Sequence, residues 1–216
     1  MTGSPPPTVL SLSRHGQTPW HAENRYCGSS DVGITAVGEK QAAALAAWAA
    51  ASRPEAVVCS PMRRCRETAA PAAAALGVEP TVVDDLHEMH FGLAEGRTLA
   101  EVERDHPGTV EAFRSDPVAH AFEGSEPPGA VARRVATALR ELATGRPGTH
   151  LLVVAHNTAM RLALCLLLGI ELAHYRHVFP RIDNGALTRL RVPTTDDPPG
   201  LLGLNIPLDG TTEDLR

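Results

Sequence analysis

The sequence lacks the features that mark several common classes of protein. Its four cysteines include no Cys-x-x-Cys pair, so neither a zinc site nor a disulfide framework is indicated. The net charge of −5 indicates no surface for a polyanion, and nucleic acid is not an expected partner. The longest apolar run, residues 159–170, contains Arg161 and is too short to cross a membrane.

Two catalytic signatures are also absent. There is no Walker-type glycine loop with its lysine, which excludes nucleotide hydrolysis of that kind. Ser60 has no Gly-x-Ser-x-Gly elbow around it, so we expect it to orient His15 through a hydrogen bond and not to act as a nucleophile. The stretch His87-Glu88-Met89-His90 is one residue shorter than the zinc-protease spacing His-Glu-x-x-His, so no metal is expected there.

The composition fits one folded unit. With 216 residues, 43% of them hydrophobic, the chain can build one sizeable core, and we expect a single domain over residues 1–216. Residues 1–7 are polar and proline-rich, with no basic start and no apolar segment, so we expect a flexible N-terminus and not a signal peptide. The polar C-terminal tail is also expected to be flexible. Unpaired thiols and the absence of a membrane segment favour a reduced, cytoplasmic setting.

Strand-like and helix-like segments alternate along the chain. Strands are predicted at residues 8–13, 56–59, 80–83, 150–155, 185–192 and 201–206. Helices are predicted at residues 35–52, 129–144 and 159–168, with another that ends at Leu76 before Gly77. This alternation predicts an α/β fold, a three-layer α/β/α sandwich with a mainly parallel central sheet.

Residues 94–128 depart from the alternation. Thr98-x-x-Glu101 forms a capping box that starts a short helix, and a second short helix is predicted at residues 109–114. We therefore expect a small helical cap inserted over the edge of the sheet. The strand at residues 185–192 is expected at the edge of the sheet, where it could pair in a homodimer.

Reactive side chains follow four of the predicted strands. Arg14 and His15 follow the first strand, Ser60 and Arg64 the second, Glu88 the third and His156 the fourth. Because ligands bind beyond the carboxyl ends of parallel strands, these side chains should meet in one crevice.

The residue types suit phosphoryl transfer. Arginine offers a planar fork of donors to phosphate oxygens, so Arg14 and Arg64 can neutralise the transferred group without a metal. His156 can contribute a further hydrogen bond to the phosphate. Neutral His15 can attack phosphorus to form a phosphohistidine, which divides one difficult displacement into two steps. Glu88 is the acid placed to protonate the leaving alkoxide and then to activate water.

Four blocks in the same order resemble the signature of the histidine phosphatase superfamily, which has the phosphoglycerate-mutase-like fold. They are Arg14-His15-Gly16-Gln17-Thr18 with Trp20 and Arg25, Ser60-Pro61-Met62-Arg63-Arg64, Leu86-x-Glu88 with Phe91-Gly92, and Val153-Val154-Ala155-His156 with Arg161. The resemblance implies phosphorylation of His15 and proton transfer by Glu88. It also implies phosphate binding by Arg14, Arg64 and His156, with no cofactor.

Three further positions are expected to bind phosphate or substrate. Gln17 belongs to the first block. His21 stands where the family commonly has an asparagine that binds phosphate, and imidazole can donate one hydrogen bond there. Asn157 follows the second histidine where the family often has glycine, and it can donate to phosphate or simply cap the next helix.

Three functions fit these residues. The first is a phosphomonoester hydrolase acting on a small phosphorylated metabolite. The second is a phosphoglycerate-mutase-type phosphotransferase, and the third is a non-catalytic binding protein on the same fold. The short cap of mixed charge favours the hydrolase, and the occupied catalytic positions argue against a binding protein. The cap and residues 19–33 are expected to set specificity, and sugar phosphates, nucleotides and other phosphorylated intermediates all remain open.

Overall fold

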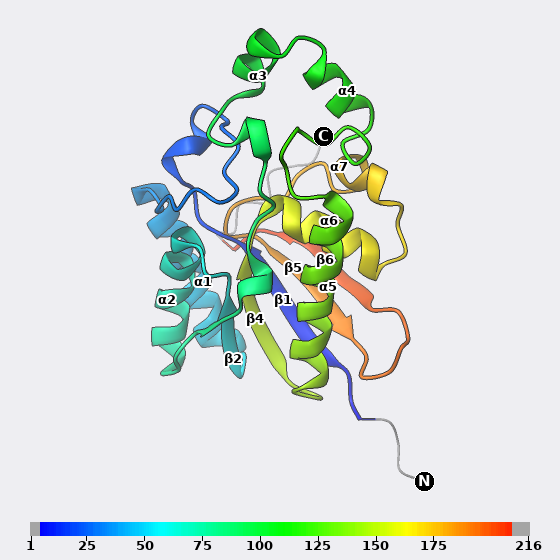
Figure 1. The fold of residues 1–216 in the computed structure, drawn as a ribbon. Helices are drawn as coiled ribbons and strands as arrows, with labels where there is room; N and C mark the ends of the chain where they lie inside the picture. The colour runs from blue at the N-terminus through cyan, green and yellow to red at the C-terminus, as the bar shows by residue number, and fades with distance from the viewer. Residues whose placement is uncertain (1–4, 209–216) are drawn as a thin grey trace.

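The computed structural model describes residues 5–208, and a six-stranded sheet forms the centre of this part of the chain (Figure 1). The strand order is β3-β2-β4-β1-β5-β6. The strands are β1 (Thr8–Arg14), β2 (Ala56–Cys59), β3 (Thr81–Val82), β4 (His150–Ala155), β5 (Leu187–Val192) and β6 (Gly200–Ile206). The first four strands pair in parallel, and β5 and β6 are antiparallel, so the prediction of a mainly parallel sheet is confirmed.

Helices cover both faces of the sheet. The long ones are α1 (Ala36–Ser52), α2 (Arg63–Leu76), α5 (Pro128–Thr144) and α6 (Asn157–Leu167), and α7 (Tyr175–Val178) is short. The short 3-10 helices are η1 (Pro19–His21), η2 (Asp84–Leu86), η3 (Gly92–Ala94) and η4 (Leu172–His174). In Figure 1, α1 and α2 lie on one side of the sheet and α5 and α6 on the other, which confirms the three-layer α/β/α architecture.

The two buried layers follow from the period-two alternation of β4. Leu151 and Val153 pack into the larger core with α5 and α6, whereas Leu152 and Val154 pack into the smaller core with α1 and α2. Because both faces are buried, the strand reads as a continuous apolar run.

Local signals determine where several helices begin and end. The Thr35 side chain accepts a hydrogen bond from the Gly38 backbone N–H and caps α1. The predicted capping box is present at the start of α3 (Leu99–Asp105), which with α4 (Thr109–Ser115) forms the cap. Gly77 ends α2 in the left-handed region at φ +69°, a conformation that glycine adopts without steric cost.

Two sequence-based expectations about the sheet are wrong. The strand at residues 185–192 is not an edge strand, because β5 is paired with β1 on one side and with β6 on the other. The edge strands of the sheet are β3 and β6. The third strand is shorter than expected, because only Thr81 and Val82 pair with β2 before η2 begins.

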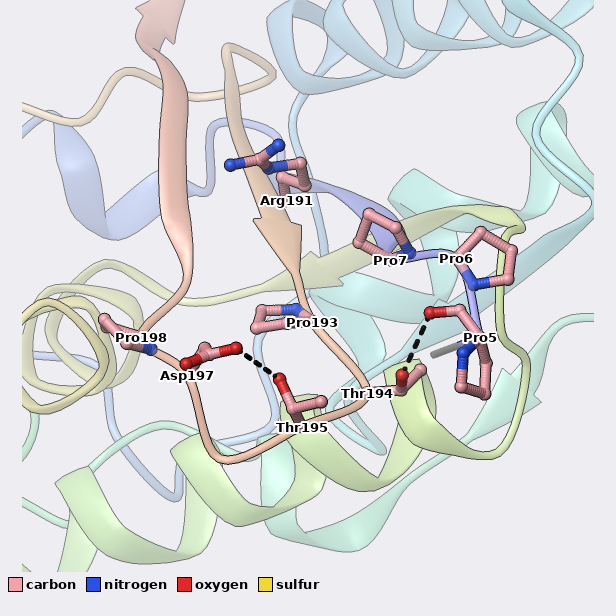
Figure 2. A pocket seen from close by; sticks show the side chains of 9 residues that line it. All are labelled: Pro5, Pro6, Pro7, Arg191, Pro193, Thr194, Thr195, Asp197 and Pro198. Carbon is pink, nitrogen blue, oxygen red and sulfur yellow. Dashed lines mark hydrogen bonds between the residues drawn. The ribbon is translucent and has the colours of Figure 1, made fainter. Parts of the chain in front are cut away.

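The residues before β1 lie at the end of the sheet away from the predicted site. Pro5, Pro6 and Pro7 line a hollow of about 370 Å³ together with the turn between β5 and β6 (Figure 2). The Thr194 hydroxyl donates to the Pro5 carbonyl at 3.2 Å. The remainder of the termini predicted to be flexible, residues 1–4 and 209–216, lies outside the described residues. Within residues 5–208 no helix is long and apolar enough to cross a membrane.

Candidate active site

The register of the parallel strands brings the two histidine-bearing blocks together. Arg14 at the end of β1 is the register partner of Ala155 at the end of β4. The next residues are therefore neighbours, and the rings of His15 and His156 lie 5.2 Å apart between centroids. The predicted meeting of these two histidines is observed.

His15 is a buried, neutral imidazole with a defined tautomer. Its Nδ1–H donates to the Gly16 carbonyl at 2.8 Å, which leaves the lone pair on Nε2. Burial lowers the pKa of His15 well below its ordinary value, and the charges of Arg64 and Arg14 lower it further. The ring therefore carries a nucleophilic nitrogen near neutral pH.

His156 is held through both ring nitrogens. The Arg64 Nε–H donates to its Nδ1 at 3.2 Å, so its Nε2–H donates to the Ser60 hydroxyl at 2.7 Å. Burial and then the Arg64 charge lower the pKa of His156 well below its ordinary value. The expectation that Ser60 orients His15 is wrong, because Ser60 follows β2, and β4 separates β2 from β1.

Arg64 is fully buried and ties α2 to the loop that follows η1. Its guanidinium donates to the backbone carbonyls of Ser30 at 2.8 Å, Gly28 at 2.9 Å and Cys27 at 3.1 Å. The adjacent Arg63 has a side chain that is 59% exposed and pairs with a glutamate one helical turn away. Arg64 therefore faces the interior, whereas Arg63 faces solvent.

Arg14 is fixed between the end of η1 and the segment before β5. Its Nη1 donates to the Ile182 carbonyl at 2.8 Å and its Nη2 to His21 Nε2 at 2.6 Å. Its Nε is buried without a hydrogen-bond partner among residues 5–208. Burial lowers the pKa of Arg14 to about 10, so the guanidinium remains charged at neutral pH.

His21 accepts a hydrogen bond in this arrangement. Because Arg14 can only donate, His21 Nε2 carries the lone pair and Nδ1–H faces the Thr18 hydroxyl at 2.9 Å. Burial, followed by the Arg14 charge, lowers the pKa of His21 to about 4. With these contacts the imidazole orients Arg14 and has no proton on Nε2 for a phosphate oxygen.

Asn184 is a site residue that the sequence did not reveal. Its Nδ2 donates to the His15 carbonyl at 2.6 Å and lies 3.3 Å from His21 Nε2. The residue stands directly before β5, and its backbone forms a bridge with Arg14. The only sequence signal at this position is an asparagine followed by a glycine at the start of a predicted strand. Because Asn-Gly pairs are common in turns, this signal does not indicate a functional residue.

The Glu88 carboxylate closes the site from the side of α6. Oε1 accepts from the backbone N–H groups of Met89 and Ala159, each at 2.8 Å, and Oε2 accepts from Thr158 at 3.0 Å. A carboxylate oxygen can accept two hydrogen bonds, so among these contacts Oε2 keeps one lone pair for a proton. The carboxylate also interacts electrostatically with Arg14, the residue before His15.

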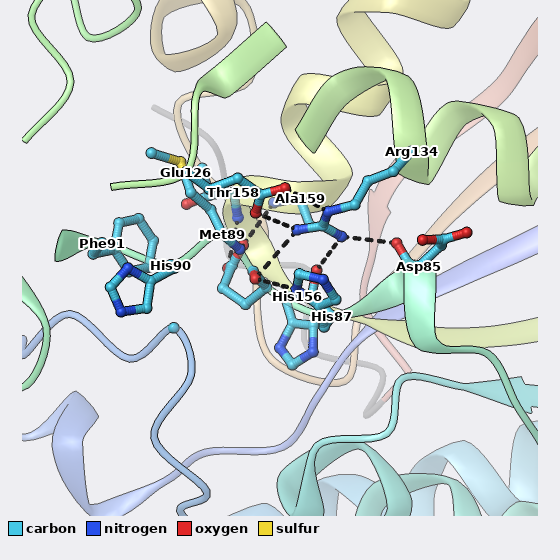
Figure 3. Close-up of polar contacts among 12 residues, drawn as sticks. Asp85, His87, Met89, His90, Phe91, Glu126, Arg134, His156, Thr158 and Ala159 are labelled. Atoms are coloured by element: carbon cyan, nitrogen blue, oxygen red, sulfur yellow. Dashed lines mark hydrogen bonds and ion pairs between the residues drawn. The ribbon is translucent and has the colours of Figure 1, made fainter. Parts of the chain in front are cut away.

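An arginine of α5 holds the backbone that carries Glu88 (Figure 3). Arg134 donates to both oxygens of Glu126 at 2.8 Å and to the carbonyls of Asp85 and His87 at 2.8 Å. A weaker bond at 3.3 Å reaches the Glu88 carbonyl. Glu126 is therefore a partly buried ion-pair partner of Arg134.

The two remaining expected ligands lie near the site with other contacts. The Gln17 side-chain carbonyl accepts from the Thr35 hydroxyl at 2.9 Å, at the start of α1. Asn157 is the first residue of α6, two residues earlier than predicted for that helix, and its Oδ1 is buried without a partner in the described chain. No group of three or more histidine, cysteine, aspartate or glutamate side chains within residues 5–208 is arranged to hold a metal ion.

Comparison with known proteins identifies the family. The model of the histidine phosphatase superfamily (branch 1) matches residues 10–206. The chain belongs to the histidine phosphatase superfamily, and its fold is the phosphoglycerate-mutase-like fold expected from the four blocks.

Individual relatives show what the chain is similar to. A bifunctional protein of Mycobacterium tuberculosis is 37% identical over 163 residues, which cover 75% of this chain and 44% of that protein. The chain thus spans less than half the length of this relative. Phosphoserine phosphatase 1 of Hydrogenobacter thermophilus is 30% identical over 166 residues, 77% of this chain and 79% of that protein. A mycobacterial glucosyl-3-phosphoglycerate phosphatase in complex with VO3 superimposes with a TM-score of 0.82 at 26% identity, over 92% of this chain and 99% of that one.

Proposed function

We propose that the protein is a phosphomonoester hydrolase that works through a phosphohistidine on His15. The observation that carries the proposal is the state of the His15 ring. The ring is neutral, its Nδ1–H is used in the bond to Gly16, and its free Nε2 belongs to a ring 5.2 Å from that of His156, with the charges of Arg64 and Arg14 acting on it. The positive charge of Arg14 and Arg64 suits the three equatorial oxygens of a transferred phosphoryl group. The reaction then needs no metal ion to neutralise that charge.

Two displacements at phosphorus account for the reaction. In the first, the lone pair on His15 Nε2 forms a bond to phosphorus while the bond to the ester oxygen breaks. Glu88 transfers a proton to that oxygen, and a neutral alcohol leaves. In the second, water attacks phosphorus as Glu88 recovers the proton, and cleavage of the P–N bond releases inorganic phosphate and neutral His15.

The surrounding residues support these steps by position. Oε2 of Glu88 has the lone pair that a transferable proton requires, and the backbone N–H groups at the start of α6 fix the carboxylate. We propose that Arg14, Arg64 and His156 bind the phosphoryl oxygens and that Asn184 and His21 orient Arg14 and His15. Gln17 and Asn157 are proposed to line the same site.

The substrate is proposed to be a small phosphorylated metabolite. Relatives named as phosphatases of phosphoserine and of glucosyl-3-phosphoglycerate support this class. Proteins named as probable phosphoglycerate mutases of Salmonella are 28% identical over 179 residues, so a phosphotransferase is the second candidate. Free thiols at Cys27, Cys59, Cys65 and Cys165 support a reducing, cytoplasmic setting.

The decisive experiment traps the phosphoenzyme. The protein is incubated with p-nitrophenyl phosphate in the presence of a chelator, quenched with base and digested, and the acid-labile phosphoryl group is located by mass spectrometry. We expect the adduct on His15 and release of free phosphate. Arg133→Met, a change on the exposed face of α5, is the matched control and should retain both.

Three outcomes decide between the candidates. His15→Ala should abolish turnover while the folded state is retained. Interconversion of phosphoglycerates without release of phosphate would instead identify a phosphotransferase. A phosphoryl adduct on any other side chain would refute the mechanism.

A further inference from the structure

A second cluster of positive charge lies beside Glu88. Arg161 on α6 and Arg176 on α7 interact electrostatically with each other. Arg161 is only 7% exposed, and its Nη2 donates to the Pro180 carbonyl at 2.8 Å. Its Nε–H is buried and has no hydrogen-bond partner among residues 5–208, and neither arginine belongs to an ion pair in that part of the chain.

The groups around Arg176 are polar or aromatic and do not compensate its charge. The hydroxyls of Tyr26 and Tyr175 interact with it, and its guanidinium lies 5.2 Å from the centre of the Phe113 ring. Burial raises the pKa of Tyr175 to about 12, so this hydroxyl stays neutral near pH 7 and can donate a hydrogen bond. Because Phe113 belongs to α4, the cluster joins the cap to α6 and α7.

The cluster lies where the leaving part of the substrate would be. Arg161 lies on α6 two residues after Ala159, whose backbone N–H donates to the Glu88 carboxylate, and charge interactions connect Arg161 to Glu88 and to Arg14. Glu88 is the group proposed to protonate the leaving alcohol, so the alcohol portion of a bound ester extends toward Arg161. A phosphoryl group carries a charge of about −2, which Arg14 and Arg64 already match. The charges of Arg161 and Arg176 are left over, and burying an unpaired cation is unfavourable.

We propose that Arg161 and Arg176 bind a second anionic group, a carboxylate or a phosphate, on the alcohol portion of the substrate. The inference rests on the proposed phosphatase activity and narrows its substrates to phosphomonoesters with two anionic groups. The arginine fork and the tyrosine hydroxyls provide donors for an anionic oxygen, whereas an uncharged alcohol would leave both cations unpaired.

The test compares esters that differ in the second charge. Phosphate release is measured for 3-phosphoglycerate against glycerol 3-phosphate, for O-phosphoserine against O-phosphoethanolamine, and for fructose 1,6-bisphosphate against fructose 6-phosphate. In the wild-type protein kcat/KM should be about 10–100-fold higher for the carboxylates or for the bisphosphate, as expected for one or two charge-assisted hydrogen bonds. Whichever pair shows the preference identifies the second anion.

Variants assign the preference to residues. Arg161→Met and Arg176→Met should each bring the ratio of the kcat/KM values of the two esters in a pair closer to one, mainly by raising KM for the ester with two anionic groups. Arg176→Lys should retain part of the preference. Arg133→Met should keep the full ratio. The wild-type ratios alone test the proposal if Arg161→Met does not fold.

The results separate this inference from the function on which it rests. Phosphate release with equal efficiency for both members of every pair would overturn the anion subsite and leave the phosphatase intact. Absence of phosphate release from every ester, p-nitrophenyl phosphate included, would overturn both.

Discussion

Arg134 offers a direct test of how the fold positions Glu88. Its guanidinium binds both oxygens of Glu126 and the carbonyls of Asp85 and His87, which lie just before Glu88 in sequence (Figure 3). Arg134→Met removes all of these bonds and keeps much of the apolar stem. The loop from Asp85 to Glu88 would then lose its hydrogen bonds to α5, although Leu86 would still pack in the same core as α5 and the Glu88 side chain would still contact the start of α6.

The loss of stability follows from the partial burial of the pair. The side chains of Arg134 and Glu126 are 14% and 21% exposed. A hydrogen bond to a charged group contributes about 1.5–3 kcal/mol, whereas exposed ion pairs contribute about 0–1 kcal/mol. We expect Arg134→Met to cost about 3 kcal/mol, between a single such bond and the sum of four. For a chain of this length that loss lowers Tm by roughly 6–12 °C.

The catalytic effect should be distinct from the loss of stability. At a temperature where the variant is folded, kcat for p-nitrophenyl phosphate should fall roughly 10–100-fold, because displacement of a catalytic group by about 1 Å can have that effect. KM should change less, since Arg134 forms no hydrogen bond with Arg14, His15 or Arg64. Arg133→Met is the control for charge. If folded Arg134→Met kept the kcat of the wild-type protein, the hydrogen bonds of Arg134 would stabilise the fold without positioning Glu88 for the reaction.

Three further predictions concern the residues around the two histidines. Gly16→Ala should lower the free energy of unfolding by about 1–3 kcal/mol, because a Cβ there would lie 2.8 Å from the Gly38 carbonyl oxygen. Calorimetry measures this loss of stability, and a variant with the wild-type Tm would contradict the close packing of Gly16 against Gly38. Ser60→Ala should cost about 1–3 kcal/mol in denaturant titrations, since His156 Nε2–H would be buried without its partner. The pKa values of His15 and His156 are lower in the folded than in the unfolded chain, so the unfolded chain binds more protons. The free energy of unfolding should therefore fall as pH is lowered below about 6.5, and urea titrations that show no decline would refute the neutral state of the two rings.

The sequence was sufficient for residues whose position depends on strand ends. Arg14, His15 and His156 follow apolar runs that any parallel arrangement would align, so their meeting required no detailed knowledge of the fold. Arg64 could be assigned from its place in the second block of the resemblance. Helix geometry alone, in which adjacent residues point about 100° apart, indicates only that Arg63 and Arg64 face different surroundings.

Residues whose partners are distant backbone groups could not be predicted. Arg134 binds carbonyls some 47 and 49 positions earlier, and every residue has a carbonyl, so no side-chain pattern marks this contact. The hydrogen-bond partner of Ser60 depended on the strand order. Because β4 lies between β2 and β1, Ser60 at the end of β2 contacts His156 and not His15. The same missing information made β5 appear to be an edge strand.

The site buries two arginine side chains, and burial of a cation opposes folding. Many hydrogen bonds from the surrounding chain are therefore needed to stabilise these side chains. Buried Arg64 donates hydrogen bonds to three backbone carbonyls of one loop. Arg14 donates to His21 and to a backbone carbonyl in the segment before β5. Each of these contacts reduces the free energy needed to keep a cation away from water, but none supplies a negative charge. Burial lowers the pKa of His15, and the positive potential of Arg64 and Arg14 lowers it further, so Nε2 stays unprotonated. The same two arginines therefore favour both the neutral state of the histidine and the binding of an anion, and neutralising either arginine should raise the pKa of His15 and weaken anion binding.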